Sequence, residues 1–491
     1  MAGGLAAPAA GVTATVPVVG AAVDGGAVDE VADDEVLDPQ DARAAMGRAS
    51  RNRRRRTAGR LSTAGHATVG TAGAQAPEGV EVQASRIYSV EDARRRAARS
   101  VPRAVFDYID GGAEDEVTLA ENGRAFREVT FRPRTTGAGP DPSTATTLLG
   151  TPLSMPVLLA PCGLVRAMHP EGAHAVARAA AAAGTVSVLS TVAGTALEDV
   201  AAQVTGPLWF QLYSPGGPAQ STELVQRAQD AGYAGLVVTM DTPALGHRER
   251  DVRHGVAPPF RLAPASAARL AAQVAARPRW VVGMGRAAIR ARAAARETGA
   301  AAAGAAGTAA AAAAGAAAGA AAGGAAGAAP TARLVAMGAS PFSWDDVAAI
   351  RTQWSGPLAV KGLLSPDDAR RAVETGVDAV IVSNHGGRQL DGAPATMRVL
   401  PLIVDAVAGR AAVIVDSGVR RGSDVVKAVA AGADAVMIGR AYLYGLAACG
   451  QPGVERVLEI LRTEMVRTLW LLGCPSIGDL DRRWIDIPGG A

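Results

Sequence analysis

Eight short apolar runs recur along the chain, and they constrain its fold more than any other feature. Segments with helical periodicity separate most of them, and five of these segments end in a glycine just before the next run: Gly184, Gly232, Gly376, Gly409 and Gly432. Continuous apolar runs that alternate with helices indicate parallel strands buried on both faces. The eight runs are residues 155–160, 185–190, 208–213, 236–241, 357–362, 379–384, 412–417 and 435–440.

Eight strand–helix units predict an α/β fold in which the sheet closes into a (β/α)8 TIM barrel. An open, doubly wound sheet is the alternative, but no GxGxxG pattern follows the first strand. Ser89 and Asp92 form a capping box that predicts a helix through Arg99, an N-terminal helical extension to the barrel. After the last strand, residues 454–472 predict an amphipathic helix that ends at Gly473.

Two segments of low complexity flank or interrupt this pattern. Residues 1–85 have few bulky apolar side chains and contain an acidic run followed by a basic run, so we expect a disordered tail. The barrel domain is predicted over residues 86–486, interrupted after the fourth strand by a variable loop, residues 255–338, with an Ala/Gly-rich insertion. Residues 276–292, which mix apolar and arginine side chains, keep a peripheral membrane contact open as an alternative.

The overall charge and the cysteines exclude several classes of protein. A formal net charge of +3 over 491 residues does not favour a nucleic-acid partner. The three cysteines show no CxxC spacing, so we predict neither a disulfide framework nor a metal site. No basic segment precedes the apolar start, so export is not expected and a cytoplasmic location is.

The ends of the predicted strands carry the groups that chemistry needs, and in such barrels the strand ends form the active site. Only two lysines stand against 47 arginines, and Lys361 ends an apolar strand, so its ammonium must face the barrel mouth. The sequence DSGVRRGSD from Asp416, together with Gly439 and Arg440, predicts a phosphate site after the last two strands.

The sequence SNHGGRQLD, residues 383–391, places a histidine at the end of the sixth strand. His385 can act as a base near neutral pH, Asp241 can hold its imidazolium, and Arg388 can bind a substrate carboxylate with two hydrogen bonds. We expect His247 and His254, in the loop after the fourth strand, to be solvated. We expect His169 and His174 to serve packing rather than chemistry.

These stretches together carry a resemblance to a known family. From Tyr88 to Asp486, the insertion excepted, the chain resembles the FMN-dependent 2-hydroxy acid dehydrogenases and oxidases, which include glycolate oxidase, L-lactate dehydrogenase, lactate monooxygenase and mandelate dehydrogenase. The matching stretches are FDYIDGGAEDEVTLAENGRAF, APCGLVRAMHPEGA, WFQLY, VVTMDTPALGHRERD, VKG, VSNHGGRQLDG, DSGVRRGSDVVKA and MIGRAYLYG.

The resemblance implies FMN as the cofactor and oxidation of a lactate-like L-2-hydroxy acid to the 2-oxo acid. Electrons would pass on to a quinone, another carrier or oxygen, and the protein would be a homo-oligomer. The resemblance makes His385 the base, Asp241 its partner and Tyr213 the group that orients the substrate hydroxyl. It places Tyr108, Arg248 and Arg388 on the substrate carboxylate. The residues that it places on FMN are Ser190, Gln211, Thr239, Lys361, Ser383, Asp416, Gly418, Arg420, Gly439 and Arg440.

Several positions depart from the pattern of the family and leave the substrate open. Val192 stands where plant glycolate oxidases have Trp, which predicts a wider pocket, and Ser417 replaces a common Gly. Gly163 stands where many oxidases have Ala, which favours a dehydrogenase or a monooxygenase. The C-terminal stretch also resembles the relative that oxidises the peptide precursor of mycofactocin, so a peptide-derived substrate is an alternative. A non-catalytic barrel that serves as a scaffold is another.

Overall fold

The structure is a computed structural model that describes residues 78–488, apart from 136–138, 140, 215, 216, 256–263 and 298–340. All the described residues belong to one compact unit of the chain, within residues 75–491. Most of the predicted tail and most of the Ala/Gly-rich insertion therefore lie outside the described residues.

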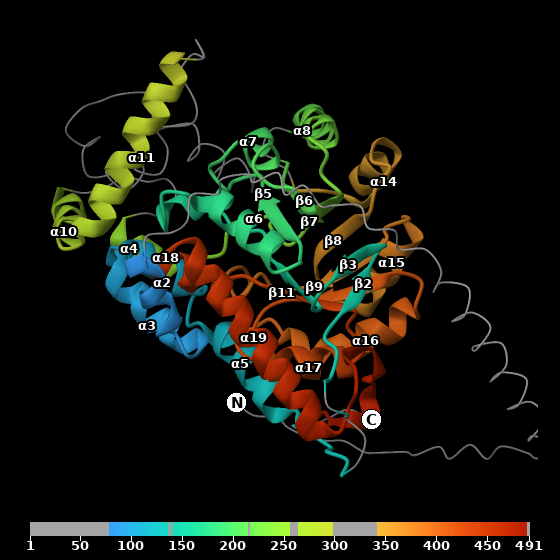
Figure 1. The fold of residues 1–491 in the computed structure, drawn as a ribbon. Coiled ribbons are helices and arrows are strands. Elements are labelled where there is room, and N and C mark those ends of the chain that lie inside the picture. Colours follow the sequence, from blue (N-terminus) through green and yellow to red (C-terminus); the bar gives the residue numbers. More distant parts are fainter. Residues whose placement is uncertain are drawn as a thin grey trace, which may run out of the picture. The chain divides into compact units, whose positions relative to one another are not determined.

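Eight parallel strands close into a barrel, as the apolar runs predicted (Figure 1). Each strand pairs with the next along the chain, and the last, β11, pairs with the first, β4. Every predicted strand is present, with each boundary within two residues of the observed one. The strands are β4 (Val157–Leu159), β5 (Ser187–Ser190), β6 (Leu208–Leu212), β7 (Gly235–Thr239), β8 (Leu358–Leu363), β9 (Ala379–Val382), β10 (Ala412–Val415) and β11 (Ala435–Ile438).

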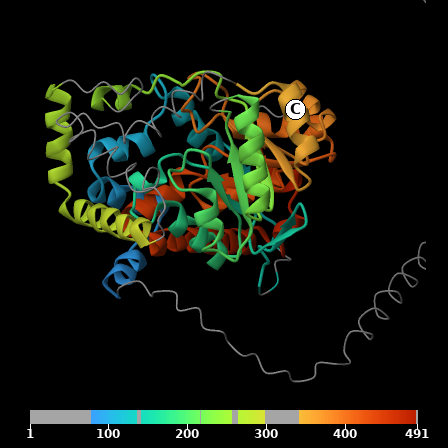
Figure 2. The ribbon, with the colours of Figure 1, turned by 90° about the horizontal axis from the view of Figure 1, so that it is seen from above.

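Helices surround the barrel and return the chain from one strand to the next (Figures 1 and 2). The five glycines predicted to end helices all have positive φ, between 65° and 109°, a backbone conformation that glycine adopts without steric cost. The helices between and after the strands are α6 (Gly172–Ala182), α7 (Leu197–Ala201), α8 (Pro218–Asp230), α9 (Glu249–His254), α10 (Pro264–Ala275), α11 (Pro278–Glu297), α14 (Trp344–Gln353), α15 (Pro366–Glu374), α16 (Thr396–Val407), α17 (Gly422–Ala430), α18 (Arg440–Cys449) and α19 (Gln451–Leu472).

Two apolar clusters hold the barrel together. The inner cluster joins side chains from the strands, such as Leu158, Ile381 and Met437, and includes Leu148 and Leu153 of a short hairpin. That hairpin, β2 (Thr146–Leu148) and β3 (Thr151–Leu153), therefore packs against the barrel interior. The larger cluster lies between the strands and the helices.

In the described part of the chain, four helices precede the barrel: α2 (Glu78–Ser85), α3 (Val90–Ser100), α4 (Arg103–Asp110) and α5 (Val117–Glu128). Helix α2 falls inside the predicted tail, because Ala84 and the following Ile87 are buried in the core, which the composition alone does not signal. Strands β1 (Thr130–Phe131) and β12 (Ile485–Asp486) then pair antiparallel and tie this extension to the C-terminal end of the domain.

The predicted capping box of α3 forms only in part. The hydroxyl of Ser89 accepts a hydrogen bond from the backbone N–H of Asp92, as expected, at 3.1 Å. The carboxylate of Asp92, however, accepts from the backbone N–H of Tyr88 rather than from that of Ser89. Helix α19 ends at Gly473 as predicted, and it begins three residues before the predicted start, at Gln451.

The predicted variable loop contains two helices in its first part, α10 and α11 (Figure 2). Trp280 and Met284 of α11 are buried, and the indole N–H of Trp280 donates to the carbonyl of Ala167. Val281 and Ile289 of the same helix are 39% and 68% exposed. Among the described residues, no helix is long and apolar enough to cross a membrane.

Candidate active site

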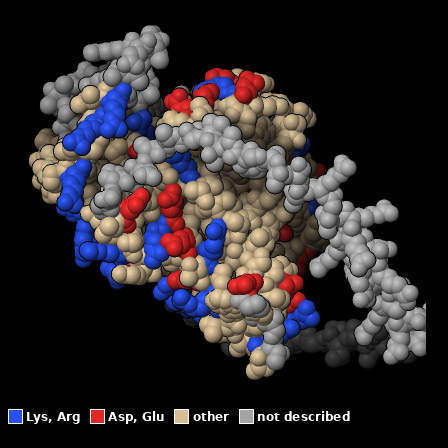
Figure 3. All heavy atoms as spheres, in the orientation of Figure 1, with Lys and Arg blue, Asp and Glu red and all other residues tan. Residues whose placement is uncertain are grey.

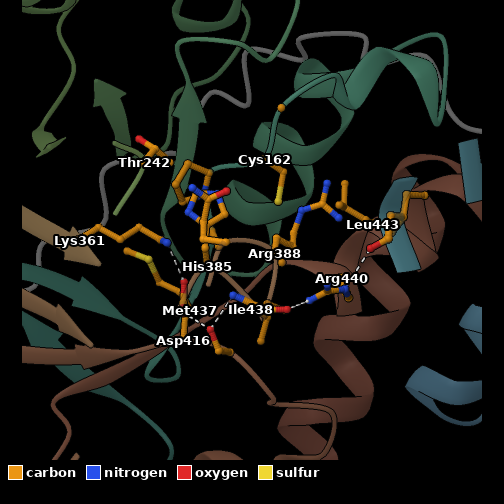
Figure 4. A pocket seen from close by; sticks show the side chains of 18 of the residues that line it. Cys162, Thr242, Lys361, His385, Arg388, Asp416, Met437, Ile438, Arg440 and Leu443 are labelled. Carbon is orange, nitrogen blue, oxygen red and sulfur yellow. Dashed lines mark hydrogen bonds and ion pairs between the residues drawn. The ribbon is translucent and has the colours of Figure 1, made fainter. Parts of the chain in front are cut away.

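A cavity of about 1040 Å³, including its open mouth, lies where the strands of the barrel end (Figure 4). Eleven of the sixteen predicted site residues line it. The other five, Asp241, Ser190, Gln211, Thr239 and Ser383, lie at the ends of the same strands and contact or adjoin the lining residues. The lining residues are Tyr108, Tyr213, Arg248, Lys361, His385, Arg388, Asp416, Gly418, Arg420, Gly439 and Arg440.

His385 and Asp241 form a pair at the mouth. Nδ1 of His385 lies 2.9 Å from Oδ1 of Asp241, so the imidazole offers Nε2 to the cavity that it lines. The backbone of His385 has a φ of 58°, and its N–H donates to the hydroxyl of Ser383. Gly362 makes room for the carboxylate, since a Cβ there would lie 2.5 Å from Cβ of Asp241.

The Asp241 carboxyl group stays ionised in this setting. Burial raises its pKa, but the positive charges of His385 and Lys361 outweigh burial, and the pKa falls below its usual value. A carboxylate next to the imidazole stabilises the imidazolium form of His385. The pair can therefore accept a proton from a molecule in the cavity and hold it.

Lys361 and Asp416 form a second pair, deeper in the barrel. The ammonium donates to the hydroxyl of Ser383 at 2.7 Å and lies 3.2 Å from Oδ2 of Asp416. Burial lowers the pKa of Lys361, but the carboxylates of Asp416 and Asp241 outweigh it, so the pKa is raised. The cavity therefore has a permanent positive charge at its base (Figure 4).

Two arginines and two tyrosines surround His385. Nη1 of Arg388 donates to the carbonyls of Tyr108 and Gly111, at 2.7 and 3.0 Å, and the guanidinium lies 4.9 Å from the centre of the Tyr108 ring. Arg248 stands just before α9 and is only 12% exposed, and burial lowers its pKa. Burial also raises the pKa of Tyr108 and of Tyr213, so both hydroxyls are neutral hydrogen-bond donors.

The opposite wall of the cavity combines glycines with the start of α18. Gly418 has a φ of 111°, and a Cβ there would lie 2.6 Å from the carbonyl oxygen of Asn122. Gly439 is the N-cap residue of α18, whose first N–H groups have no partner within the helix. Such a helix start binds anions, and phosphate in particular.

The two arginines of this wall, Arg440 and Arg420, differ in their hydrogen-bond partners. Arg440 is partly buried, and its guanidinium donates to the carbonyls of Ile109, Gly386 and Gly111, at 2.9, 2.8 and 2.8 Å. Burial, followed by the charge of Arg388, lowers its pKa to about 10. Nη1 of Arg420 donates to a carbonyl in its own loop, that of Val419. Arg440 thus also joins α4 to the loop after β9.

Three buried polar atoms at the ends of β6 and β7 test whether the site suits FMN. Among the described residues, Nε2 of Gln211, Oγ1 of Thr239 and Oδ2 of Asp241 are buried without a hydrogen-bond partner. The hydroxyl of Ser190 donates to Oε1 of Gln211, which fixes the amide and leaves its N–H groups free. An unpaired buried polar group is costly. Together with Lys361 and the anion site at α18, these groups fit a flat, polar ring system with a phosphate tail.

Some supporting contacts had not been predicted. Asn122 of α5 and Asn384 exchange two amide hydrogen bonds, at 2.9 and 2.7 Å, and fix the loop of His385. Asn384 adjoins His385 and could have been singled out, whereas Asn122 lies 262 residues away and gives no local signal. In the described part of the chain, no group of three or more His, Cys, Asp or Glu side chains could hold a metal ion.

The expectation for His254 was wrong. Its Nε2 lies 2.7 Å from Oδ2 of Asp107 and its side chain is 18% exposed, because α9 packs against α4. His247 is exposed, as expected. His169 and His174 do not line the cavity, and burial lowers the pKa of each.

The fold and this set of groups define a flavin-dependent oxidoreductase built on a TIM barrel. Comparison with known proteins gives the family: residues 97–487 match the family described as FMN-dependent dehydrogenase, and the chain belongs to it. It is an FMN-dependent dehydrogenase or oxidase of 2-hydroxy acids.

Three relatives illustrate the range of this family. A putative L-lactate dehydrogenase of Mycobacterium tuberculosis is 38% identical over 81% of this chain and 88% of its own length. A pre-mycofactocin synthase of Mycolicibacterium smegmatis is 40% identical, over 82% of this chain and 94% of its own. The crystal structure of (S)-mandelate dehydrogenase, a monotopic membrane protein, has a TM-score of 0.70 and 36% identity, over 82% of this chain and all of that one.

Proposed function

We propose that the protein oxidises a lactate-like L-2-hydroxy acid to the 2-oxo acid, with His385 as the base. The observation that carries this proposal is the pair of His385 and Asp241, 2.9 Å apart, facing a cavity with cationic groups around it. The intact set of base, carboxylate and cations argues against a non-catalytic scaffold.

The substrate carboxylate binds between Arg248 and Arg388, whose guanidinium groups stand on the same side of the cavity as the hydroxyl of Tyr108. Tyr213 orients the substrate hydroxyl, since its own hydroxyl is buried and neutral. Nε2 of His385 then accepts a proton from the substrate, and Asp241 stabilises the imidazolium that results.

Bound FMN supplies an acceptor for two electrons and is expected to pass them on to a quinone, another carrier or oxygen. Lys361 provides a positive charge that favours the reduced, anionic ring, and Ser383 holds its ammonium. Ser190, Gln211 and Thr239 present hydrogen-bonding groups to the ring, and Asp416 presents its carboxylate to the ribityl chain. Gly418, Gly439, Arg420 and Arg440 hold the phosphate.

The substrate side chain extends toward Val192, which lines the cavity beside Gly163. A Cβ at Gly163 would lie 3.0 Å from Cγ2 of Val192, so Gly163 lets Val192 pack closely against it. A valine at this wall, rather than a large aromatic side chain, leaves room for a substrate side chain of moderate size. A peptide-derived substrate is the second candidate, favoured by the 40% identity to the pre-mycofactocin synthase.

The test is an absorbance spectrum of the purified holoenzyme, followed by anaerobic addition of L-lactate, glycolate, L-mandelate and longer 2-hydroxy acids. Bleaching of the flavin bands by one of them supports the proposal and identifies the substrate. A yellow protein that no small acid bleaches refutes the lactate-like assignment and favours the peptide-derived substrate. Failure to bind FMN at all refutes both.

The location proposed is the cytoplasm, with peripheral contact to a membrane through α11. Its exposed Val281, Val282 and Ile289 lie beside arginines, and basic side chains gather along the edge of the molecule formed by α10, α11 and the N-terminal helices (Figure 3). Co-sedimentation with anionic vesicles, lost in Ile289→Glu, tests this contact. Light scattering of the same sample tests the expected homo-oligomer.

A further inference from the structure

The side chain of Gln389 joins the two loops that carry His385 and Asp241. Its Nε2 donates to the backbone carbonyls of Asp241 and Ala244, at 3.0 and 2.8 Å. Its Oε1 accepts from the backbone N–H of Gly246 at 3.3 Å. The amide of Gln389 therefore binds the first, fourth and last residues of the segment 241–246, which we call the β7 loop.

The two loops also touch through their backbones. A Cβ on Gly246 would lie 2.3 Å from the carbonyl oxygen of Arg388 and 2.5 Å from that of Gln389, so only glycine allows this approach. Gln389 lies four residues after His385, in the loop that follows β9. The segment that carries the imidazole thus also holds the backbone that carries the carboxylate.

We propose that Gln389 is a positioning residue, which sets the distance between the Asp241 carboxylate and the His385 imidazole by fixing the β7 loop. The inference rests on the proposed function, in which His385 is the base. Without the amide, two carbonyls and one N–H of the β7 loop lose their partners. Water can replace them because Gln389 is only half-buried, but water does not fix the position of the loop.

Other charged and polar groups also face the pair, and none of them accepts a hydrogen bond from the Gln389 side chain or donates one to it. They are Lys361 and Asp416 from the barrel base, Arg248 before α9, Arg388 in the loop of His385, and the hydroxyls of Tyr108 and Tyr213.

The test is Gln389→Met, a side chain of similar length that makes none of the three hydrogen bonds. In the 15N-histidine-labelled holoenzyme, with His385→Asn to assign the resonance, we expect the Nδ1–H proton resonance of His385 to move upfield, because a longer hydrogen bond to the Asp241 carboxylate deshields that proton less. We expect kcat to fall about tenfold, while KM changes little.

The matched control is Gln273→Met. Gln273 is also half-buried and joins two segments, since its Oε1 accepts from the backbone N–H of Ala104 at 2.9 Å. Loss of a structural amide alone lowers the melting temperature in both variants, but the Nδ1–H resonance of His385 moves only in Gln389→Met. An unchanged Nδ1–H resonance of His385 in that variant overturns the inference.

Two further features keep the test decisive. If Gln389→Met does not fold, Gln389→Asn keeps the amide but is one methylene shorter, and a smaller shift in the same direction is expected. The resonance measurement needs no turnover. A protein that shows the shift but oxidises no 2-hydroxy acid therefore fails the proposed function and leaves the positioning role of Gln389 intact.

Discussion

Each of the two ion pairs in the cavity joins a basic nitrogen to a carboxylate, but the two pairs have different chemical roles. His385 and Asp241 stand at the mouth, and the His385 side chain is 23% exposed, so its free nitrogen can exchange a proton with a bound molecule. Lys361 and Asp416 lie at the base, with side chains 5% and 10% exposed, and the raised pKa of Lys361 keeps its charge fixed. Depth in the barrel thus separates a proton acceptor from a permanent charge.

The largest effect is expected when the proton acceptor, His385, is removed and Lys361 is kept. In His385→Asn we expect flavin reduction by substrate to slow by about a hundredfold to ten-thousandfold, because general base catalysis contributes about 10² to 10⁴ and Asn cannot accept the proton. The protein should stay yellow, since Lys361 and the phosphate wall are untouched. Stopped-flow absorbance under anaerobic conditions measures the rate.

His169→Asn is the control for that experiment, because His169 is also a partly buried histidine but does not line the cavity. It should reduce the flavin at the wild-type rate. Flavin reduction at the wild-type rate in His385→Asn would contradict the role of His385 as the base, and another group at the mouth would then have to accept the proton.

Removing the permanent charge should give the next largest effect, and of a different kind. Lys361→Met leaves Asp416 buried without its cation, which costs about 3 kcal/mol of folding stability and weakens FMN retention. The double variant Lys361→Met/Asp416→Asn should regain most of the stability but not the affinity for FMN. Chemical denaturation and FMN titration of the apoprotein measure the two quantities separately; equal losses in the single and double variants would contradict the pairing.

The two ion pairs should also lose their contributions to folding stability at opposite ends of the pH scale. The raised pKa of Lys361 stabilises the fold below its ordinary value of 10.5, and this contribution is lost as pH rises through the folded-state pKa. The lowered pKa of Asp241 stabilises the fold above its ordinary value of 3.8, and this is lost as pH falls through the folded-state pKa. The stability difference between wild type and Lys361→Met should shrink only above about pH 10.5, and that for Asp241→Asn only below about pH 3.8.

The sequence predicted the parts of this site that depend on strand ends. Lys361 and His385 end apolar runs, so the barrel pattern alone brings them to one end of the barrel, and in the structure both line the same cavity. The contacts that the sequence did not predict join segments far apart in the chain, such as Asn122 with Asn384 or His254 with Asp107. Helical periodicity predicts which face of a helix is buried, but not which side chains of other segments contact that face. The capping of α3 shows the same limit on a local scale, because two backbone N–H groups compete for Asp92.

Ser417 links the two ion pairs by hydrogen bonds. Changing it should have the smallest effect of the substitutions considered, and it tests whether the two pairs are coupled. Its hydroxyl donates to Oδ1 of Asp416 at 2.6 Å and accepts from the N–H of Gly386, next to His385, at 2.9 Å. Its φ of 69° costs a non-glycine residue about 1 kcal/mol, and the two hydrogen bonds return a similar amount.

Ser417→Gly should therefore leave the melting temperature nearly unchanged, because it loses the hydrogen bonds but also the strain. Ser417→Ala keeps the strain and loses the hydrogen bonds, so we expect it to be less stable than both the wild type and the Gly variant, by about 1 to 2 kcal/mol. Thermal unfolding of the three holoenzymes measures this order. If Ala proves as stable as Ser, the hydroxyl contributes nothing and the two pairs act independently. If Gly proves less stable than Ala, the φ of 69° does not strain residue 417.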